Sequence, residues 1–107
     1  MKQRKFKPFG NISSLSLGGG GIGNVWGQTT RSERVSTVSL AIDSGINHLD
    51  MAPMYGKGEA ERVVREAFKE LDHSAINLTT KCRLGTVKDS EVYTRLNNSL
   101  CRSLETM

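Results

Sequence analysis

The sequence has few of the features that mark several large classes of protein. It contains only two cysteines, Cys82 and Cys101, whose spacing does not fit a metal site. No apolar run approaches the roughly 18 residues that cross a bilayer. The basic N-terminus has no apolar stretch behind it, so no secretory signal and therefore no disulfide is predicted. We expect a cytoplasmic chain that does not enter a membrane and holds no metal.

Charge of one sign is only slightly in excess. The chain has 15 Lys and Arg against 11 Asp and Glu, a net charge of +4, and part of the excess lies in the first eight residues. A basic segment can attract phosphates or nucleic acid, but aromatic residues do not alternate with the basic ones here. We therefore expect a solvated N-terminal surface and no nucleic-acid partner. The 107 residues suffice for one small domain at most.

Three short apolar segments are predicted to be strands, at residues 14–18, 46–50 and 75–81. Their first residues lie about 30 positions apart, and a helical pattern fills each gap. Strands that alternate with helices are typical of βαβ units and a parallel sheet. With helices on one side, three strands leave two edges and one face uncovered. The sequence therefore predicts an α/β fold that is unfinished.

Each predicted helix has an apolar stripe and a recognisable end. Thr30 and Glu33 have the spacing of a capping box before the first helix, and Gly45 is a plausible left-handed stop after it. The second helix is predicted over 59–71, and the third begins at a cap formed by Asp89 or Ser90. We expect the stripes to pack on the sheet. The stripe residues are Val35, Val38, Ala41 and Ile42; Ala60, Val63, Val64, Ala67, Phe68 and Leu71; and Val92, Leu96, Leu100 and Leu104.

The glycine-rich segment 18–23 allows more than one interpretation. It matches the pattern G-x-G-x-x-G after a strand, and Asp50 ends the next strand, as in a Rossmann dinucleotide site. A Rossmann turn leads directly into its helix, whereas the helix here starts only after Thr30. A wide loop at the carboxyl ends of barrel strands is the alternative, in which Trp26 could form a pocket wall. A merely flexible surface loop is the third interpretation.

The segment from Gly45 to Glu61 is the most specific in the chain. A strand ending in Asp50 is followed by a small-residue turn, by Tyr55-Gly56 and by a helix that opens with Glu. This pattern closely resembles the signature of the aldo-keto reductase family. Other segments resemble the family in the expected order. Residues 1–9 resemble one arm of the hairpin below the barrel, and residues 12–18 resemble the first strand. Residues 79–81 resemble the end of the third strand, and residues 95–104 resemble the helix before the fourth strand.

The resemblance implies a (β/α)8 TIM barrel, of which residues 1–107 are the N-terminal hairpin and the first three βα units. It implies an oxidoreductase that interconverts aldehydes or ketones and alcohols with NADP(H), acting on small molecules. The family's catalytic Asp, Tyr and Lys fall on Asp50, Tyr55 and Lys81. Its cofactor-binding residues are placed at Gly18, Gly19, Gly20 and, again, Asp50.

The family's fourth catalytic residue is a His at the end of the fourth strand, which this chain does not reach. His48 precedes Asp50 within the second strand and His73 lies before the third, so neither is a substitute. We expect residues 1–107 alone to be inactive. Two positions depart from the family pattern, Met51 in place of Thr and Arg65 in place of Gly; Arg65 is expected either to alter packing or to mark relaxed constraint. A non-catalytic interaction module derived from the barrel is the alternative function.

The chemistry of the three catalytic candidates is consistent with these roles. Hydride transfer to a carbonyl leaves negative charge on its oxygen, and a proton must arrive there. A free tyrosine is a weak acid, but an adjacent ammonium group favours the phenolate and makes the phenol a better proton donor. Lys81 would supply that ammonium group, and Asp50 would hold it in place. Asp50 and Tyr55 flank one βα turn and Lys81 ends the next strand, so all three meet at the catalytic rim of a barrel.

Overall fold

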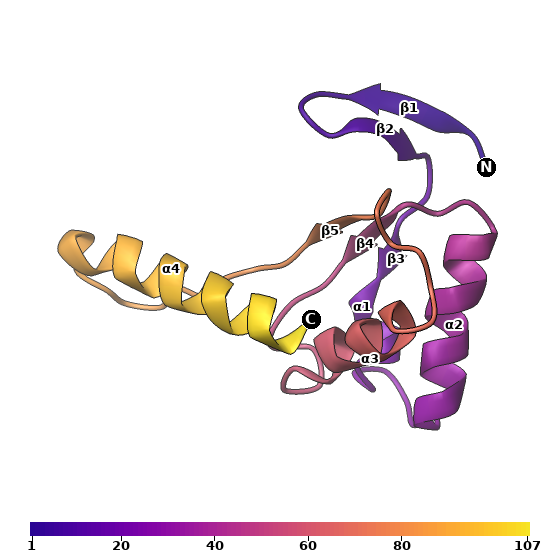
Figure 1. The fold of residues 1–107 in the computed structure, drawn as a ribbon. Helices are drawn as coiled ribbons and strands as arrows, with labels where there is room; N and C mark the ends of the chain where they lie inside the picture. Colours follow the sequence, from indigo (N-terminus) through magenta and orange to yellow (C-terminus); the bar gives the residue numbers. More distant parts are fainter.

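A computed structural model describes all 107 residues (Figure 1). A β-hairpin comes first, followed by three strands of a parallel sheet and the helices that connect them. No helix is long and apolar enough to cross a membrane. In chain order the elements are β1 (Gln3–Phe6), β2 (Gly10–Ser13), β3 (Leu17–Gly18), α1 (Gly19–Ile22), α2 (Arg31–Asp43), β4 (His48–Asp50), α3 (Glu59–Phe68), β5 (Asn77–Thr79) and α4 (Asp89–Thr106).

The N-terminal hairpin contains both β1 and β2, in antiparallel register with Gln3 opposite Ser13 and Phe6 opposite Gly10. It lies across one end of the parallel sheet (Figure 1). The hairpin arm expected within residues 1–9 is present. Ile12 and Ser13, assigned from the sequence to the first barrel strand, belong instead to the second arm of the hairpin. Their assignment rests on the family resemblance, whereas the apolar segment in the sequence begins only at Ser14.

The three remaining strands form one parallel sheet in the order β3-β4-β5. Leu49 lies between Leu17 and Leu78, and Asp50 lies between Gly18 and Thr79. All three strands are shorter than the predicted segments, and β3 and β5 each have a neighbour on one side only. The sheet is open at both edges and no barrel is closed. The predicted α/β architecture of three successive βα units is confirmed.

The ends of α2 confirm the local signals in the sequence. Thr30 Oγ1 accepts from the backbone N–H of Glu33, and a Glu33 carboxylate oxygen accepts from the backbone N–H of Thr30, which completes a capping box. At the other end Gly45 has φ +86°. Its N–H donates to the carbonyl of Ile42, and the N–H of Ile46 donates to Ala41, as in a Schellman motif.

The core lies between the sheet and the two helices α2 and α3, which cover the same face (Figure 1). Leu49 projects from β4 into this layer and is fully buried. Arg31 and Arg34 of α2 both bind the carboxylate of Glu59, at 2.6 and 2.8 Å, and this ties the two helices together. Arg65 points outward and donates to the carbonyl of Glu105, so it does not disturb the core. The buried apolar residues are Ala52 and the eight members of the core cluster, Ile22, Val38, Leu49, Met51, Ala60, Val63, Val64 and Ala67.

Helix α4 corrects two predictions. Asp89 is its first helical residue and not its cap; the cap position is Lys88, whose backbone N–H donates to Glu91. The stripe expected to pack on the sheet is exposed: Leu96, Leu100 and Leu104 are 44%, 50% and 66% exposed. Figure 1 shows α4 extending away from the sheet, with only its last turns beside α3. The stripe has no cover because the sheet ends at β5 and offers this helix no further strand.

Candidate active site

The candidate site forms where the parallel strands end. The register places Gly18, Asp50 and Thr79 in one row across β3, β4 and β5. Lys81 follows two residues after Thr79, and Tyr55 lies in the turn after Asp50. Because His48 and Asp50 alternate with the buried Leu49, their side chains leave β4 on the face that α2 and α3 do not cover. This placement brings the three predicted catalytic residues together.

Lys81 is the centre of the group. Its ammonium donates to Asp50 Oδ1 at 2.8 Å and to the carbonyl oxygen of Met51 at 2.9 Å. The same nitrogen lies 5.0 Å from the centroid of the Tyr55 ring. Two of its three N–H groups are thus fixed by the strand-end acceptors, and the third is left for the region of the phenol. The arrangement can hold a positive charge next to a hydroxyl group.

The electrostatics of the pair keep both groups ionised. The hydrogen bond from Lys81 is the main reason that the pKa of Asp50 lies below its usual value, although partial burial opposes it; Thr79 and the charge of His48 add to the lowering. Burial alone would lower the pKa of Lys81. The hydrogen bond to Asp50 and the nearby phenol of Tyr55 outweigh that effect, so the pKa of Lys81 is raised. Each side chain is about 40% exposed, so solvent screens part of this attraction.

The turn that carries Tyr55 depends on the glycine that follows it. Gly56 has φ +61°, and a Cβ there would collide with the carbonyl oxygen of Gly23. Sterics therefore require a glycine after Tyr55, because only glycine allows the backbone of this turn to touch the backbone after α1. The contact fixes where Tyr55 emerges from the turn.

The glycine-rich segment is more ordered than either loop interpretation predicted. Residues Gly19–Ile22 form the single helical turn α1 directly after β3. The missing Cβ of Gly19 leaves room for Met51 and the Tyr55 ring, and that of Gly20 leaves room for the Trp26 ring. Of the three glycines assigned to cofactor binding, Gly18 alone has open space beside it. Glycine-rich sequences disfavour helices, so propensity could not predict α1. Trp26 covers Gly20 and is itself 80% exposed.

Two polar residues next to Asp50 were not identified as functional from the sequence. Thr79 Oγ1 donates to Asp50 Oδ1 at 2.9 Å, and His48 Nε2 lies 3.4 Å from the same hydroxyl oxygen. The signal that could have found Thr79 is strand register, since it sits directly across from Asp50. His48 could have been found from its position two residues before Asp50, because alternate residues share a face.

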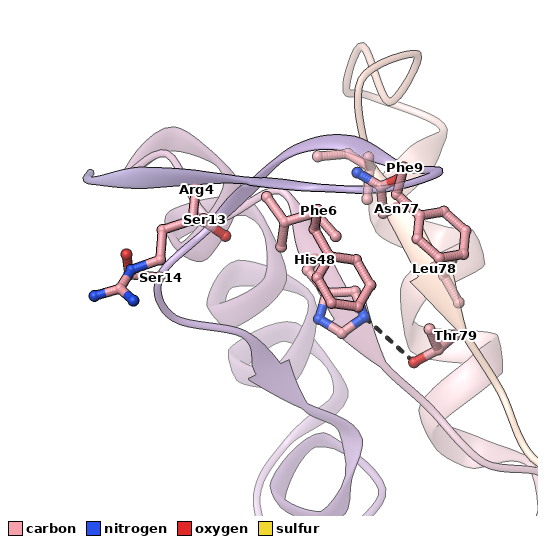
Figure 2. A pocket seen from close by; sticks show the side chains of 11 residues that line it. Arg4, Phe6, Phe9, Ser13, Ser14, His48, Asn77, Leu78 and Thr79 are labelled. Carbon is pink, nitrogen blue, oxygen red and sulfur yellow. Dashed lines mark hydrogen bonds between the residues drawn. The ribbon is translucent and has the colours of Figure 1, made fainter.

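The largest cavity lies beside this site and not at its centre. It has a volume of about 740 Å³, between the hairpin and the uncovered side of the sheet. Figure 2 shows Phe6 and Phe9 on the hairpin side, with His48 and Thr79 at the sheet. Neither Tyr55 nor Lys81 lines it. No group of three or more His, Cys, Asp or Glu side chains is arranged to hold a metal, and both cysteines are free.

Comparison with known proteins agrees with this geometry. The family model described as "Aldo/keto reductase family" matches residues 14–107. Aldo-keto reductase YhdN of Bacillus subtilis is 34% identical over 89 residues, which are 81% of this chain and 27% of that protein. L-galactose dehydrogenase of Arabidopsis thaliana is 31% identical over 98 residues, 88% of this chain and 30% of that protein. An aldo-keto reductase from Klebsiella pneumoniae, solved with NADPH, superposes with a TM-score of 0.73 at 28% identity, covering 98% of this chain and 36% of that one.

The chain belongs to the aldo-keto reductase family, a family of oxidoreductases. Its fold is the opening part of the TIM barrel of these relatives, and it spans about a quarter to a third of their length. This result excludes the Rossmann interpretation of residues 18–23. The helical turn at Gly19 follows its strand closely, but the strands belong to a barrel and not to a doubly wound sheet.

Proposed function

We propose that a complete barrel containing this chain interconverts aldehydes or ketones and alcohols with NADP(H). Asp50, Tyr55 and Lys81 are the catalytic residues, and the substrates are small carbonyl compounds or alcohols. The observation that carries the proposal is the Lys81 ammonium, held by Asp50 at 2.8 Å and placed 5.0 Å from the Tyr55 ring centroid. Protonation of a carbonyl oxygen needs a positioned acid, here the tyrosine, and a cation beside it that a strand-end carboxylate holds in place.

Each residue has a distinct task in this proposal. Tyr55 donates its hydroxyl proton to the carbonyl oxygen as negative charge develops there, and takes it back in the reverse direction. Lys81 stabilises the phenolate that remains. Asp50 keeps Lys81 charged and holds it between the carboxylate and the carbonyl of Met51. When bound, the nicotinamide supplies or accepts the hydride.

The residues present fit one end of such a cofactor. Gly18 lies beside Asp50 in the sheet and has open space where a side chain would project, so a flat ring could approach the backbone there. Gly19 and Gly20 contribute by letting Tyr55 and Trp26 close in around that space. The NADPH in the Klebsiella pneumoniae structure supports NADP. A relative from Escherichia coli, 28% identical over 87 residues, is named an NADH-specific methylglyoxal reductase, so both cofactors belong in the test.

The test joins this chain to the remainder of a barrel. Residues 14–107 replace the matching part of the Bacillus subtilis relative, and a second fusion uses the Arabidopsis thaliana relative. Loss of nicotinamide absorbance is followed with a generic aldehyde and NADPH or NADH. We expect turnover with NADPH of roughly 1 per second or more, within the usual range for enzymes. A fusion that folds and binds NADPH but has no turnover would contradict the proposal and favour a non-catalytic interaction module.

The isolated chain provides the complementary measurement. It lacks most of the barrel, so we expect no NADPH-dependent reduction of the same aldehyde by residues 1–107 alone. Turnover at a normal enzymatic rate would show that three βα units suffice and that the remaining barrel has no part in the reaction.

A further inference from the structure

A row of hydrogen bonds extends from Asp50 across the uncovered face of the sheet. Thr79 Oγ1 is 2.9 Å from Asp50 Oδ1, His48 Nε2 is 3.4 Å from Thr79 Oγ1, and His48 Nδ1 is 2.7 Å from Ser16 Oγ. Figure 2 shows the imidazole and the Thr79 hydroxyl facing each other across β4 and β5. The row links β4, β5 and the residue just before β3 to the carboxylate that holds Lys81.

The direction of each bond follows from the number of hydrogens available. An ionised carboxylate can only accept, so the single hydroxyl hydrogen of Thr79 is donated to Asp50. Toward His48 the Thr79 oxygen can then only accept, and His48 Nε2 must carry a hydrogen. In the neutral imidazole Nδ1 is therefore an acceptor, and Ser16 donates to it. Every donor in the row points toward Asp50.

We propose that Thr79 is a positioning residue for the Asp50–Lys81 pair, and that His48 and Ser16 orient its hydroxyl. This inference rests on the proposed function. Asp50 Oδ1 accepts from Lys81 on one side and from Thr79 on the other, so both partners come from β5 and the residues just after it. With two donors the carboxylate is held in one orientation. With Lys81 as its single donor, the carboxylate can rotate about its side-chain bonds, and the Met51 carbonyl is then the only fixed acceptor for the ammonium.

The role has a consequence for pH dependence. The titratable groups around Asp50 are Lys81 after β5, His48 on its own strand and Tyr55 in the following turn. Strand β3 and the preceding Ser16 contribute no titratable group. A hydrogen bond to a carboxylate favours its ionised form. Removing the Thr79 hydroxyl therefore lets Asp50 take up a proton at higher pH, and Lys81 loses its partner there. The fall of kcat on the acid side moves upward in pH.

The test compares Thr79→Val, Thr79→Ser and Tyr55→Phe in the active fusion. We expect Thr79→Val to lower kcat about 10-fold, because a hydrogen bond to a charged group is lost. KM should stay almost unchanged, and the acid limb of the pH profile of kcat should shift to higher pH. Thr79→Ser keeps the hydroxyl and should restore the parent's kcat and pH profile. A Thr79→Val protein with the parent's kcat and acid limb would overturn the role of Thr79. If Tyr55→Phe also kept its activity, the proposed function itself would fail.

A neighbouring threonine provides the control for a merely structural effect. Thr80 donates to the buried carboxylate of Glu61 at 2.8 Å and has no hydrogen bond to Asp50, whose donors are Thr79 and Lys81. We expect Thr80→Val to lower stability while its kcat and acid limb stay those of the parent. Nitrogen-15 NMR of the fusion, at a pH where the imidazole of His48 is neutral, shows independently which ring nitrogen carries the hydrogen. A hydrogen on Nε2 is expected, and a ring with its hydrogen on Nδ1 would contradict the row.

Discussion

Helices α3 and α4 have similar sequence patterns and very different surroundings. Both have apolar stripes at helical spacing, yet Ala60, Val63 and Val64 of α3 are fully buried, whereas Leu96 and Leu100 of α4 are about half exposed. An apolar stripe shows which face of a helix is suited to burial, but not whether the same chain provides residues that bury it. Helix α3 is covered because α1 and α2 lie beside it and its apolar residues share the core with Leu49 of β4, whereas α4 lies beyond the last strand.

The same contrast separates the candidate site from the hairpin. The turn around Tyr55 is in backbone contact with the segment after α1, and Lys81 is fixed by two acceptors. In the hairpin, Phe6 and Phe9 stack on each other and remain more than half exposed. The well-packed part of the chain is thus the part that carries the proposed catalytic residues. Substitutions in matched pairs, one in each part, can break or sharpen this comparison.

The largest difference is expected between core and stripe leucines. Leu49→Ala removes a fully buried side chain and should cost about 2–5 kcal/mol in the free energy of unfolding. Leu100→Ala removes a half-exposed one and should change it by less than about 0.5 kcal/mol. Urea unfolding of the isolated chain, followed by circular dichroism, measures both. If the two variants lost similar amounts of unfolding free energy, Leu100 of α4 would be as tightly packed as the buried core.

Two glycines with positive φ provide the second comparison. Gly56→Ala adds a Cβ that meets the Gly23 carbonyl, whereas at Gly10 (φ +78°) a Cβ meets nothing within 4 Å. A left-handed backbone alone costs a non-glycine residue about 1–2 kcal/mol. We expect Gly10→Ala to cost that amount and Gly56→Ala to cost clearly more and to abolish turnover of the active fusion. Equal effects of the two changes on stability and turnover would show that the Tyr55 turn is not held by backbone contact.

The smallest difference is expected between the caps of α2 and α4. Thr30→Ala breaks a capping box and should destabilise the chain by about 1 kcal/mol. Lys88→Ala at the start of α4 leaves the backbone bond to Glu91 intact and should have almost no effect. Bonds from Thr30 hold the pKa of Glu33 below its usual value, so this part of the stability is present near neutral pH and is lost as pH falls. A Thr30→Ala effect that is the same at pH 7 and pH 3 would contradict the reciprocal box.

Much of this architecture could be predicted because its signals are local. The capping box at Thr30, the stop at Gly45 and the signature around Asp50 and Tyr55 depend on neighbouring residues, and all of these elements are present. The roles of Asp50, Tyr55 and Lys81 remain predictions, although the structure brings the residues together. The exposure of α4, the helical turn at Gly19 and the contact of Thr79 with Asp50 depend on which segments meet in space. These tertiary contacts cannot be read from a single sequence.

The most direct test of the proposed catalytic role is Tyr55→Phe in the active fusion, with Tyr93→Phe as its control. Tyr93 is 78% exposed on α4 and is not among the partners of Asp50 or Lys81, so its hydroxyl should not matter. We expect Tyr55→Phe to lower kcat about 100-fold or more, which is the usual contribution of a general acid, while NADPH binding barely changes. Tyr93→Phe should retain the parent's kcat. If Tyr55→Phe kept near-parental kcat on several carbonyl compounds, Tyr55 would be a packing residue and the account of the site would be wrong.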